Sequence, residues 1–129
     1  MNLILFFCLY WMGIAGPVDV SVPAGEVVIE EVVDPVQRWR PLVADYFPPD
    51  EIGTALCIID RESGGDPDAD NPRSTASGLF QILGSLWAPR FDVSTADLYE
   101  PLTNIRLARE IWELQGWSAW SPYQRGACH

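Results

Sequence analysis

The sequence contains no lysine, and its single histidine is the last residue, His129. The eight basic residues are all arginine, and 18 acidic residues outnumber them, so the formal net charge is -10. Because nucleic-acid binding depends on neutralising phosphates, an acidic chain without a basic cluster argues against a nucleic-acid partner. The same balance weakens binding to an anionic membrane surface and removes electrostatic attraction to an anionic cell wall. A lone terminal histidine has no metal-binding partners, and we expect neither a metal nor another cofactor.

Charged residues are also missing from residues 1–15, an apolar run that fits a signal peptide better than a full membrane span. Small residues at 13 and 15, or at 22 and 24, offer cleavage sites, so cleavage is expected after residue 15 or as late as residue 24. The run lacks the usual Lys and Arg, which leaves an uncleaved N-terminal anchor as the alternative. We therefore expect a secreted or envelope-associated protein, with a stable membrane partner only if the leader is retained.

Cysteine is scarce: the chain has Cys8 in the apolar run and then Cys57 and Cys128. An even number remains after the leader of an exported chain, which favours a Cys57–Cys128 disulfide. Such a bond would tie the C-terminal tail to a central helix and add roughly 4 kcal/mol in the chain-entropy model. The alternative is two unpaired thiols, one of them buried, which an oxidising compartment disfavours.

Residues 16–33 are rich in proline, valine and acidic residues and contain no basic residue, so we predict an acidic linker. Residues 34–129 suffice for one domain. Apolar residues recur there at helical spacing between Pro and Gly boundaries. The expected helices are 34–46, 50–63, a short one near 85–88, and 100–115. Loops are expected at 66–77 and 90–99. The fold class is therefore mostly α-helical, with at most a minimal β-hairpin near 78–83.

Glu62 is an unusual residue for its position. It falls in the last turn of a predicted helix, just before Gly64, with Ile58 and Ile59 one turn earlier. Apolar neighbours and the negative end of the helix dipole both raise the pKa of a carboxyl group. A raised pKa is what a proton donor needs near neutral pH. The alternative is a solvated glutamate paired with a nearby arginine.

No second carboxylate stands out as a catalytic partner. Asp66, Asp68 and Asp70 follow Glu62 in the polar loop and could reach a cleft, but turn formation is the more ordinary role of such residues. Their spacing matches the start of a calcium loop, yet Asn71 replaces the required glycine and Ser77 replaces the final glutamate.

Four sequence blocks then occur in order. They are Glu62-Ser-Gly-Gly, Ser77-Gly-Leu-Phe-Gln81, Asp97-Leu-Tyr-Glu-Pro-Leu-Thr-Asn-Ile105 and Gly116-Trp-Ser-Ala-Trp120. Together they resemble soluble lytic transglycosylases of the lysozyme-like superfamily, in particular the short actinobacterial or phage type. The chain is also similar to resuscitation-promoting-factor domains. The resemblance spans about residues 50–128 and implies a small lysozyme-like domain.

The resemblance implies a monomeric enzyme that acts on peptidoglycan glycan strands and cleaves the MurNAc-GlcNAc β-1,4 bond. Glu62 would first protonate the glycosidic oxygen and then act as a base while the muramic acid 6-hydroxyl closes a 1,6-anhydro ring. Two alternatives stay open, a hydrolytic muramidase and a non-catalytic peptidoglycan-binding module of the same fold.

The resemblance also implies substrate contacts along the second and fourth blocks. The expected sugar-binding residues are Ser63, Gly78, Leu79, Phe80, Gln81, Trp117, Trp120 and Tyr123. Ser63 either supports Glu62 or caps the helix, and Trp117 and Trp120 either stack on sugars or pack in the core. Larger family members carry an Ala-Tyr-Asn-Ala-Gly block that is missing here, and Tyr123 or Trp120 is expected to occupy the space of its tyrosine.

Overall fold

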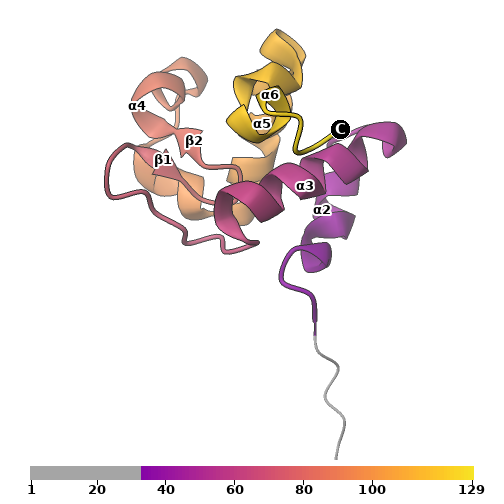
Figure 1. Ribbon diagram of the computed structural model, residues 1–129. Coiled ribbons are helices and arrows are strands. Elements are labelled where there is room, and N and C mark those ends of the chain that lie inside the picture. The colour runs from indigo at the N-terminus through magenta and orange to yellow at the C-terminus, as the bar shows by residue number, and fades with distance from the viewer. Residues whose placement is uncertain (1–32) are drawn as a thin grey trace, which may run out of the picture. The chain divides into compact units, whose positions relative to one another are not determined.

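The computed structural model describes residues 33–129 (Figure 1). The predicted leader and most of the predicted linker lie outside the described residues, so these segments and the division between them stay predictions. Within residues 33–129, no helix is both long and apolar enough to cross a membrane.

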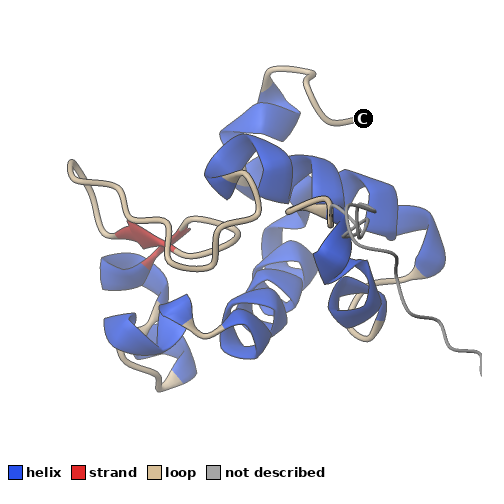
Figure 2. Cartoon of the chain, turned by 90° about the horizontal axis from the view of Figure 1, so that it is seen from below, coloured by secondary structure: helices blue, strands red, loops and turns tan. Residues whose placement is uncertain are grey.

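Two long helices form the centre of the domain (Figures 1 and 2). Helix α3, Ile52–Ser63, follows a 3-10 turn at Pro49–Glu51 and ends where Gly64 adopts a left-handed φ of 63°. Helix α5, Pro101–Gln115, begins at the N-cap Glu100, whose carboxylate accepts a 2.8 Å hydrogen bond from the backbone N–H of Thr103. Both helices confirm the sequence prediction. A proline lies at or just before the start of each helix, and a glycine follows its last residue.

The predicted helix 34–46 is interrupted. Asp34 does cap it, since its Oδ1 accepts hydrogen bonds from the backbone N–H groups of Val36 and Gln37 at 2.8 and 3.1 Å. A 3-10 turn at Gln37–Trp39 then leads into a short α2, Arg40–Ala44. Pro41 explains the break, because it has no N–H to donate and its ring would clash with the carbonyl four residues earlier.

The predicted minimal hairpin is present. Strands β1, Ala76–Ser77, and β2, Ile82–Leu83, pair antiparallel with Ala76 opposite Leu83. Gly78 begins the turn with φ 78°, and a Cβ there would lie 2.3 Å from the carbonyl oxygen of Leu98. Glycine is therefore required at this position by both conformation and space.

The segments after the hairpin hold more structure than expected. Helix α4, Gly84–Trp87, matches the predicted short helix, but residues 90–99 are not a plain loop, because 3-10 turns occupy Pro89–Phe91 and Thr95–Tyr99. Ser94 and Asp97 form a reciprocal capping box that starts the second turn. The tail contains a 3-10 turn at Gly116–Ala119 and helix α6, Ser121–Gln124.

The core lies between α3, α5 and the hairpin. Its fully buried side chains include Ile58 and Ile59 from α3 and Ile105 and Leu107 from α5. A chain of aromatic rings, with neighbouring centroids 5.3 to 5.6 Å apart, runs through Phe47, Trp117, Trp120 and Phe80. The predicted Cys57–Cys128 disulfide is formed, with the Cα atoms 5.6 Å apart. The fold class is thus confirmed as mostly helical with a small hairpin.

Candidate functional site

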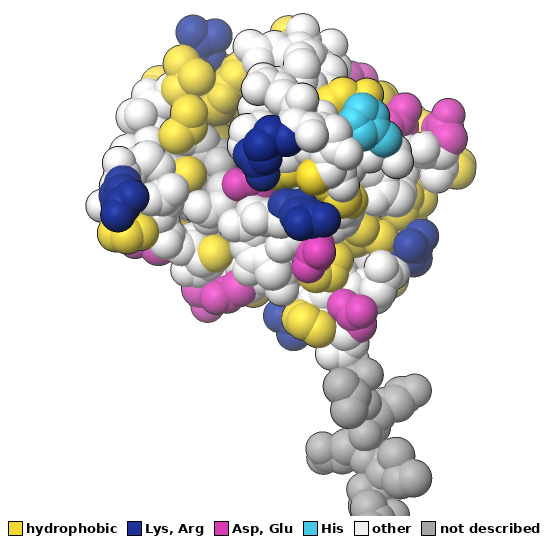
Figure 3. All heavy atoms as spheres, in the orientation of Figure 1, with side chains coloured by type: hydrophobic (Ala, Val, Ile, Leu, Met, Phe, Trp, Pro, Cys, Tyr) yellow, Lys and Arg dark blue, Asp and Glu magenta, His cyan; other side chains and the backbone are white. Residues whose placement is uncertain are grey.

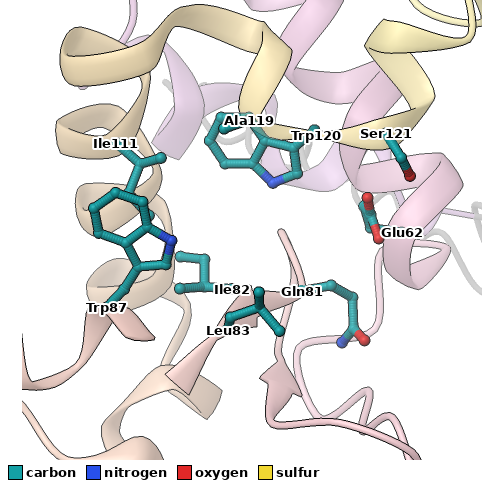
Figure 4. Close-up of a pocket in the computed structure, with 9 residues that line it drawn as sticks. All are labelled: Glu62, Gln81, Ile82, Leu83, Trp87, Ile111, Ala119, Trp120 and Ser121. Atoms are coloured by element: carbon teal, nitrogen blue, oxygen red, sulfur yellow. The ribbon is translucent and has the colours of Figure 1, made fainter. Parts of the chain in front are cut away.

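Glu62 lines a cavity of about 200 Å³. Figure 4 shows Glu62 at one end of it, between Ser121 and Gln81, and Trp87 at the opposite end. Five parts of the chain form the walls: the end of α3, the hairpin, α4, α5 and the segment from 119 to 121. The nine lining residues are Glu62, Gln81, Ile82, Leu83, Trp87, Ile111, Ala119, Trp120 and Ser121.

A second, more open hollow of about 500 Å³ is also lined by Glu62. Its remaining lining residues are Gln81 and the loop residues Asp70, Asn71, Pro72 and Arg73. Glu62 and Gln81 belong to both hollows. An extended ligand that occupied both would therefore contact Glu62.

The electrostatic environment of Glu62 agrees with the direction expected from its position. The side chain is half-buried above the buried Ile58 and Ile59, and burial raises the pKa of its carboxyl group. The positive charge of Arg125 acts in the opposite direction and lowers that pKa, but less strongly than burial raises it. Among residues 33–129, no ion pair or side-chain hydrogen bond holds the carboxyl group, so the alternative of a paired, solvated glutamate is not what the structure shows.

Arg125 directly follows the last residue of α6. Its Nη1 donates a 3.0 Å hydrogen bond to the hydroxyl oxygen of Ser121, which lines the cavity beside Glu62. Because the disulfide attaches Cys128 to Cys57 on α3, the segment that carries Arg125 is covalently tied to the helix that carries Glu62.

Gln81 has an unusual backbone conformation for a residue with a side chain, with φ 49°. Its amide nitrogen donates hydrogen bonds to the carbonyl oxygens of Ala69 and Gly78 at 3.1 and 3.0 Å. These bonds use the amide hydrogens to hold the hairpin turn against the loop after α3. The side-chain oxygen is left as the group able to accept a hydrogen bond from a ligand.

Two neighbouring positions do not expose their side chains to a sugar. Leu79 and Phe80 are fully buried in the core. The backbone N–H of Phe80 donates to Asn104 Oδ1, and its carbonyl oxygen accepts from the indole N–H of Trp120, both at 2.9 Å. Gly78 is buried too, and its N–H donates to Ala69. Burial keeps the side chains of Leu79 and Phe80 away from a ligand, and internal hydrogen bonds use the backbone groups named above. The expected substrate contacts at these positions stay predictions.

Ser63 caps the helix end. Its hydroxyl donates to the carbonyl oxygen of Ile59 and accepts from the N–H of Gly65, each at 3.1 Å. Ser63 makes no hydrogen bond to Glu62 within the described residues and lines neither hollow. The capping role that the sequence left as one of two options is the one observed.

The aromatic residues divide between core and cavity. Trp120 and Trp87 are both buried, and both line the cavity. Trp117 packs in the core, where its indole N–H donates to Glu51 at 2.7 Å. Tyr123 stacks on His129 with ring centroids 5.0 Å apart and lines neither hollow. Of the two residues expected to occupy the space of the missing tyrosine, Trp120 is the one that lines the cavity.

The acidic loop mainly forms turns. Asp66 Oδ1 accepts the backbone N–H of Asp68 at 2.9 Å, which is the turn-forming role expected for such residues. Asp70 Oδ1 accepts the hydroxyl of Tyr99 at 2.8 Å and so ties the loop to the 3-10 turn at Thr95–Tyr99.

Sequence reasoning gave Asn104 no role, although its side chain supports the site. It is fully buried on α5 and bonds to the N–H of Phe80 and the carbonyl oxygens of Ser77 and Leu98, at 2.8 to 3.0 Å. The available signal was an amide among the apolar positions of the helix, since a buried polar group needs partners. Ser121 and Ala119 carried no comparable signal.

Comparisons with known proteins identify the family of the chain. The chain is 39% identical over 67 residues to a protein of Staphylococcus saprophyticus described as "Probable transglycosylase SceD 2". The matched region is 49% of this chain and 27% of the relative, so the chain spans about a quarter of that protein's length. No solved structure matches the chain. The family model "Transglycosylase SLT domain" matches residues 49–115, slightly more than half of the sequence, and the chain therefore belongs to the SLT transglycosylase family.

Proposed function

We propose that this domain binds a peptidoglycan glycan strand across the two hollows and cleaves its MurNAc-GlcNAc β-1,4 bond, with Glu62 as both acid and base. The observation that carries the proposal is the placement of Glu62, a half-buried carboxyl group of raised pKa at the junction of the cavity and the hollow. A strand that crosses this junction brings a glycosidic oxygen to a carboxyl group whose raised pKa favours the protonated form that a proton donor needs.

The cavity offers the surfaces that a sugar requires. Trp87 and Trp120 provide aromatic surface for the apolar face of a pyranose ring, and Ile82, Leu83 and Ile111 add aliphatic surface for an N-acetyl methyl group. The free side-chain oxygen of Gln81 provides an acceptor for an N-acetyl N–H. These contacts fix the sugar so that the scissile bond lies over Glu62.

The chemistry follows from one carboxyl group. Glu62 donates its proton to the glycosidic oxygen as the bond from that oxygen to C1 of the muramic acid breaks. The resulting carboxylate removes the proton of the muramic acid 6-hydroxyl, whose oxygen bonds to C1 and closes the 1,6-anhydro ring. Glu62 ends the cycle protonated, as it began, and no water is consumed.

The lining residues favour this route over hydrolysis. Glycosidases that hydrolyse their substrate commonly use two carboxylates. Glu62 is the one carboxyl group among the nine residues of the cavity, and Asp70 in the adjoining hollow already accepts the hydroxyl of Tyr99. The proposal includes export through the apolar leader, because the substrate lies outside the cytoplasm.

Digestion of purified cell walls tests the proposal, with mass spectrometry of the released muropeptides. We expect 1,6-anhydro products from the wild-type protein and loss of release in Glu62→Gln. Asp60→Asn is the matched control, because Asp60 is an exposed carboxylate on the same helix that lines neither hollow at Glu62. Products with reducing ends would identify a hydrolase instead, and binding of the strands without any product would identify a binding module.

A further inference from the structure

The two hollows beside Glu62 differ in chemistry. Six of the nine residues that line the cavity are apolar or aromatic, whereas Pro72 is the one apolar residue among the six of the other hollow. A glycan backbone of alternating N-acetylated sugars presents similar groups to both sides. The backbone of the strand alone therefore does not account for the polar hollow.

Arg73 supplies the positive charge of the polar hollow. Its side chain is exposed, and the ion pair found within residues 33–129 joins Arg109 to Glu113 and does not involve Arg73. The rest of the chain is acidic, and the face in Figure 3 carries separated basic side chains rather than a continuous patch. An unpaired guanidinium in a hollow of such a protein is a local site for an anionic group.

The loop that carries Arg73 is held in place. Asn71 Oδ1 accepts the backbone N–H of Arg73 at 2.9 Å, and Asp70 is fixed by the Tyr99 hydroxyl and by a bridge to Ser77. Pro72 restricts the backbone between them. Binding a ligand here would therefore order little more than the arginine side chain.

We infer that the Arg73 hollow binds a carboxylate of the peptide stem that the muramic acid carries, an inference that rests on the proposed function. A guanidinium pairs with a carboxylate through two parallel hydrogen bonds, which gives both strength and orientation. Asp70 places a negative charge in the same hollow. That charge disfavours a purely anionic ligand such as a phosphate polymer, and it suits a peptide that presents an amino group as well as a carboxylate.

The test compares Arg73→Gln with Arg40→Gln on two substrates. Arg40 is also exposed and lines a hollow of about 440 Å³, but that hollow does not include Glu62. The substrates are glycan strands that keep their peptide stems and the same strands after an amidase has removed them, both freed of phosphate polymers. For each protein, the rate on stem-bearing strands is divided by the rate on stem-free strands. We expect Arg73→Gln to lower this ratio about tenfold, because the variant loses a charge-assisted pair of hydrogen bonds to the stem. Arg40→Gln should leave both rates within about twofold of wild type, as a change in an exposed residue away from the site does.

Three outcomes would overturn the inference: an equal loss on both substrates, no loss on either, or a defect that appears only on walls that retain phosphate polymers. A binding experiment keeps it testable if wild type cleaves nothing. Calorimetry compares the binding affinities for stem-bearing and stem-free soluble strands. It uses Glu62→Gln and the double variant Glu62→Gln, Arg73→Gln, so that no strand is cleaved. We expect Arg73→Gln to lower the ratio of the two affinities, stem-bearing over stem-free. Absence of cleavage with stem-selective, Arg73-dependent binding refutes the proposed catalysis but supports this inference.

Discussion

The indole N–H of Trp120 donates a 2.9 Å hydrogen bond to the carbonyl oxygen of Phe80, 40 residues earlier in the chain. The two rings also pack, with centroids 5.6 Å apart. This contact joins the C-terminal segment to the hairpin turn, and both of these segments form walls of the cavity beside Glu62. The shape of the site therefore depends on a contact between segments far apart in sequence.

Replacing Trp120 with Phe should lower the free energy of unfolding by about 1–3 kcal/mol, because the carbonyl oxygen of Phe80 loses its buried partner. The rate of cell-wall digestion should fall as well, since the cavity wall changes shape. Urea denaturation measures the first effect. Trp112→Phe is the control, because Trp112 belongs to the same aromatic cluster but its indole donates no hydrogen bond within the described residues. Equal losses in the two variants would contradict the role given to the hydrogen bond.

Asn104→Leu should lower the free energy of unfolding strongly, although leucine is apolar and similar in size to asparagine. It removes three hydrogen bonds and leaves the N–H of Phe80 and the carbonyl oxygens of Ser77 and Leu98 unpaired. We expect a loss of about 3–5 kcal/mol, measured by thermal or denaturant unfolding. Leu102→Ala, at an exposed position of the same helix, should change stability by no more than about 0.5 kcal/mol. A loss for Asn104→Leu as small as that of the control would show that the amide network is dispensable.

The Cys57–Cys128 bond closes a sequence separation of 71 residues. The double variant Cys57→Ala, Cys128→Ala should therefore be less stable by about 4 kcal/mol in the chain-entropy model. Denaturant curves of the oxidised protein and the double variant give the difference. Reductant should lower the stability of the wild type and leave that of the double variant unchanged. A wild-type protein that is indifferent to reductant would mean that the bond does not form in solution.

Arg125→Gln should shift the pH dependence of cleavage. Burial raises the pKa of Glu62 and Arg125 lowers it, so removal of the arginine should raise that pKa further. The first step needs protonated Glu62, so the rate falls as the pH rises through this pKa, and the variant should keep its activity to a higher pH. Asp70 and Arg73 share the hollow with Glu62, and both stay unchanged in the variant. Rate profiles from about pH 4 to about pH 8 measure the shift. Arg40→Gln serves as the control. If Arg125→Gln instead lost its activity at a lower pH than the wild type, the assigned effect of Arg125 on the pKa of Glu62 would be wrong.

Several features were predictable from the sequence because they depend on neighbours along the chain. Gly64 and Gly116 end α3 and α5, and Pro101 lies at the start of α5, because these effects act within one turn. The same reasoning placed Glu62 in the last turn of α3, where apolar neighbours raise its pKa. The single helix predicted at 34–46 was wrong, because Pro41 interrupts it.

Other features depend on contacts that no local pattern encodes. The indole of Trp117 donates to Glu51, whereas the indole of Trp120 donates to the carbonyl oxygen of Phe80. These long-range contacts place Trp120, and not Trp117, in the wall of the cavity. Packing also decided that the side chains of Leu79 and Phe80 are fully buried, and it gave Asn104 a structural role. The sequence by itself thus determined the two long helices, the pairing of Cys57 with Cys128 and the carboxyl group at the end of α3. The helices follow from interactions within one turn, and Cys57 and Cys128 are the two cysteines of the domain. The tertiary structure alone decided which side chains face Glu62, because packing brings α3, the hairpin and the C-terminal segment together around it.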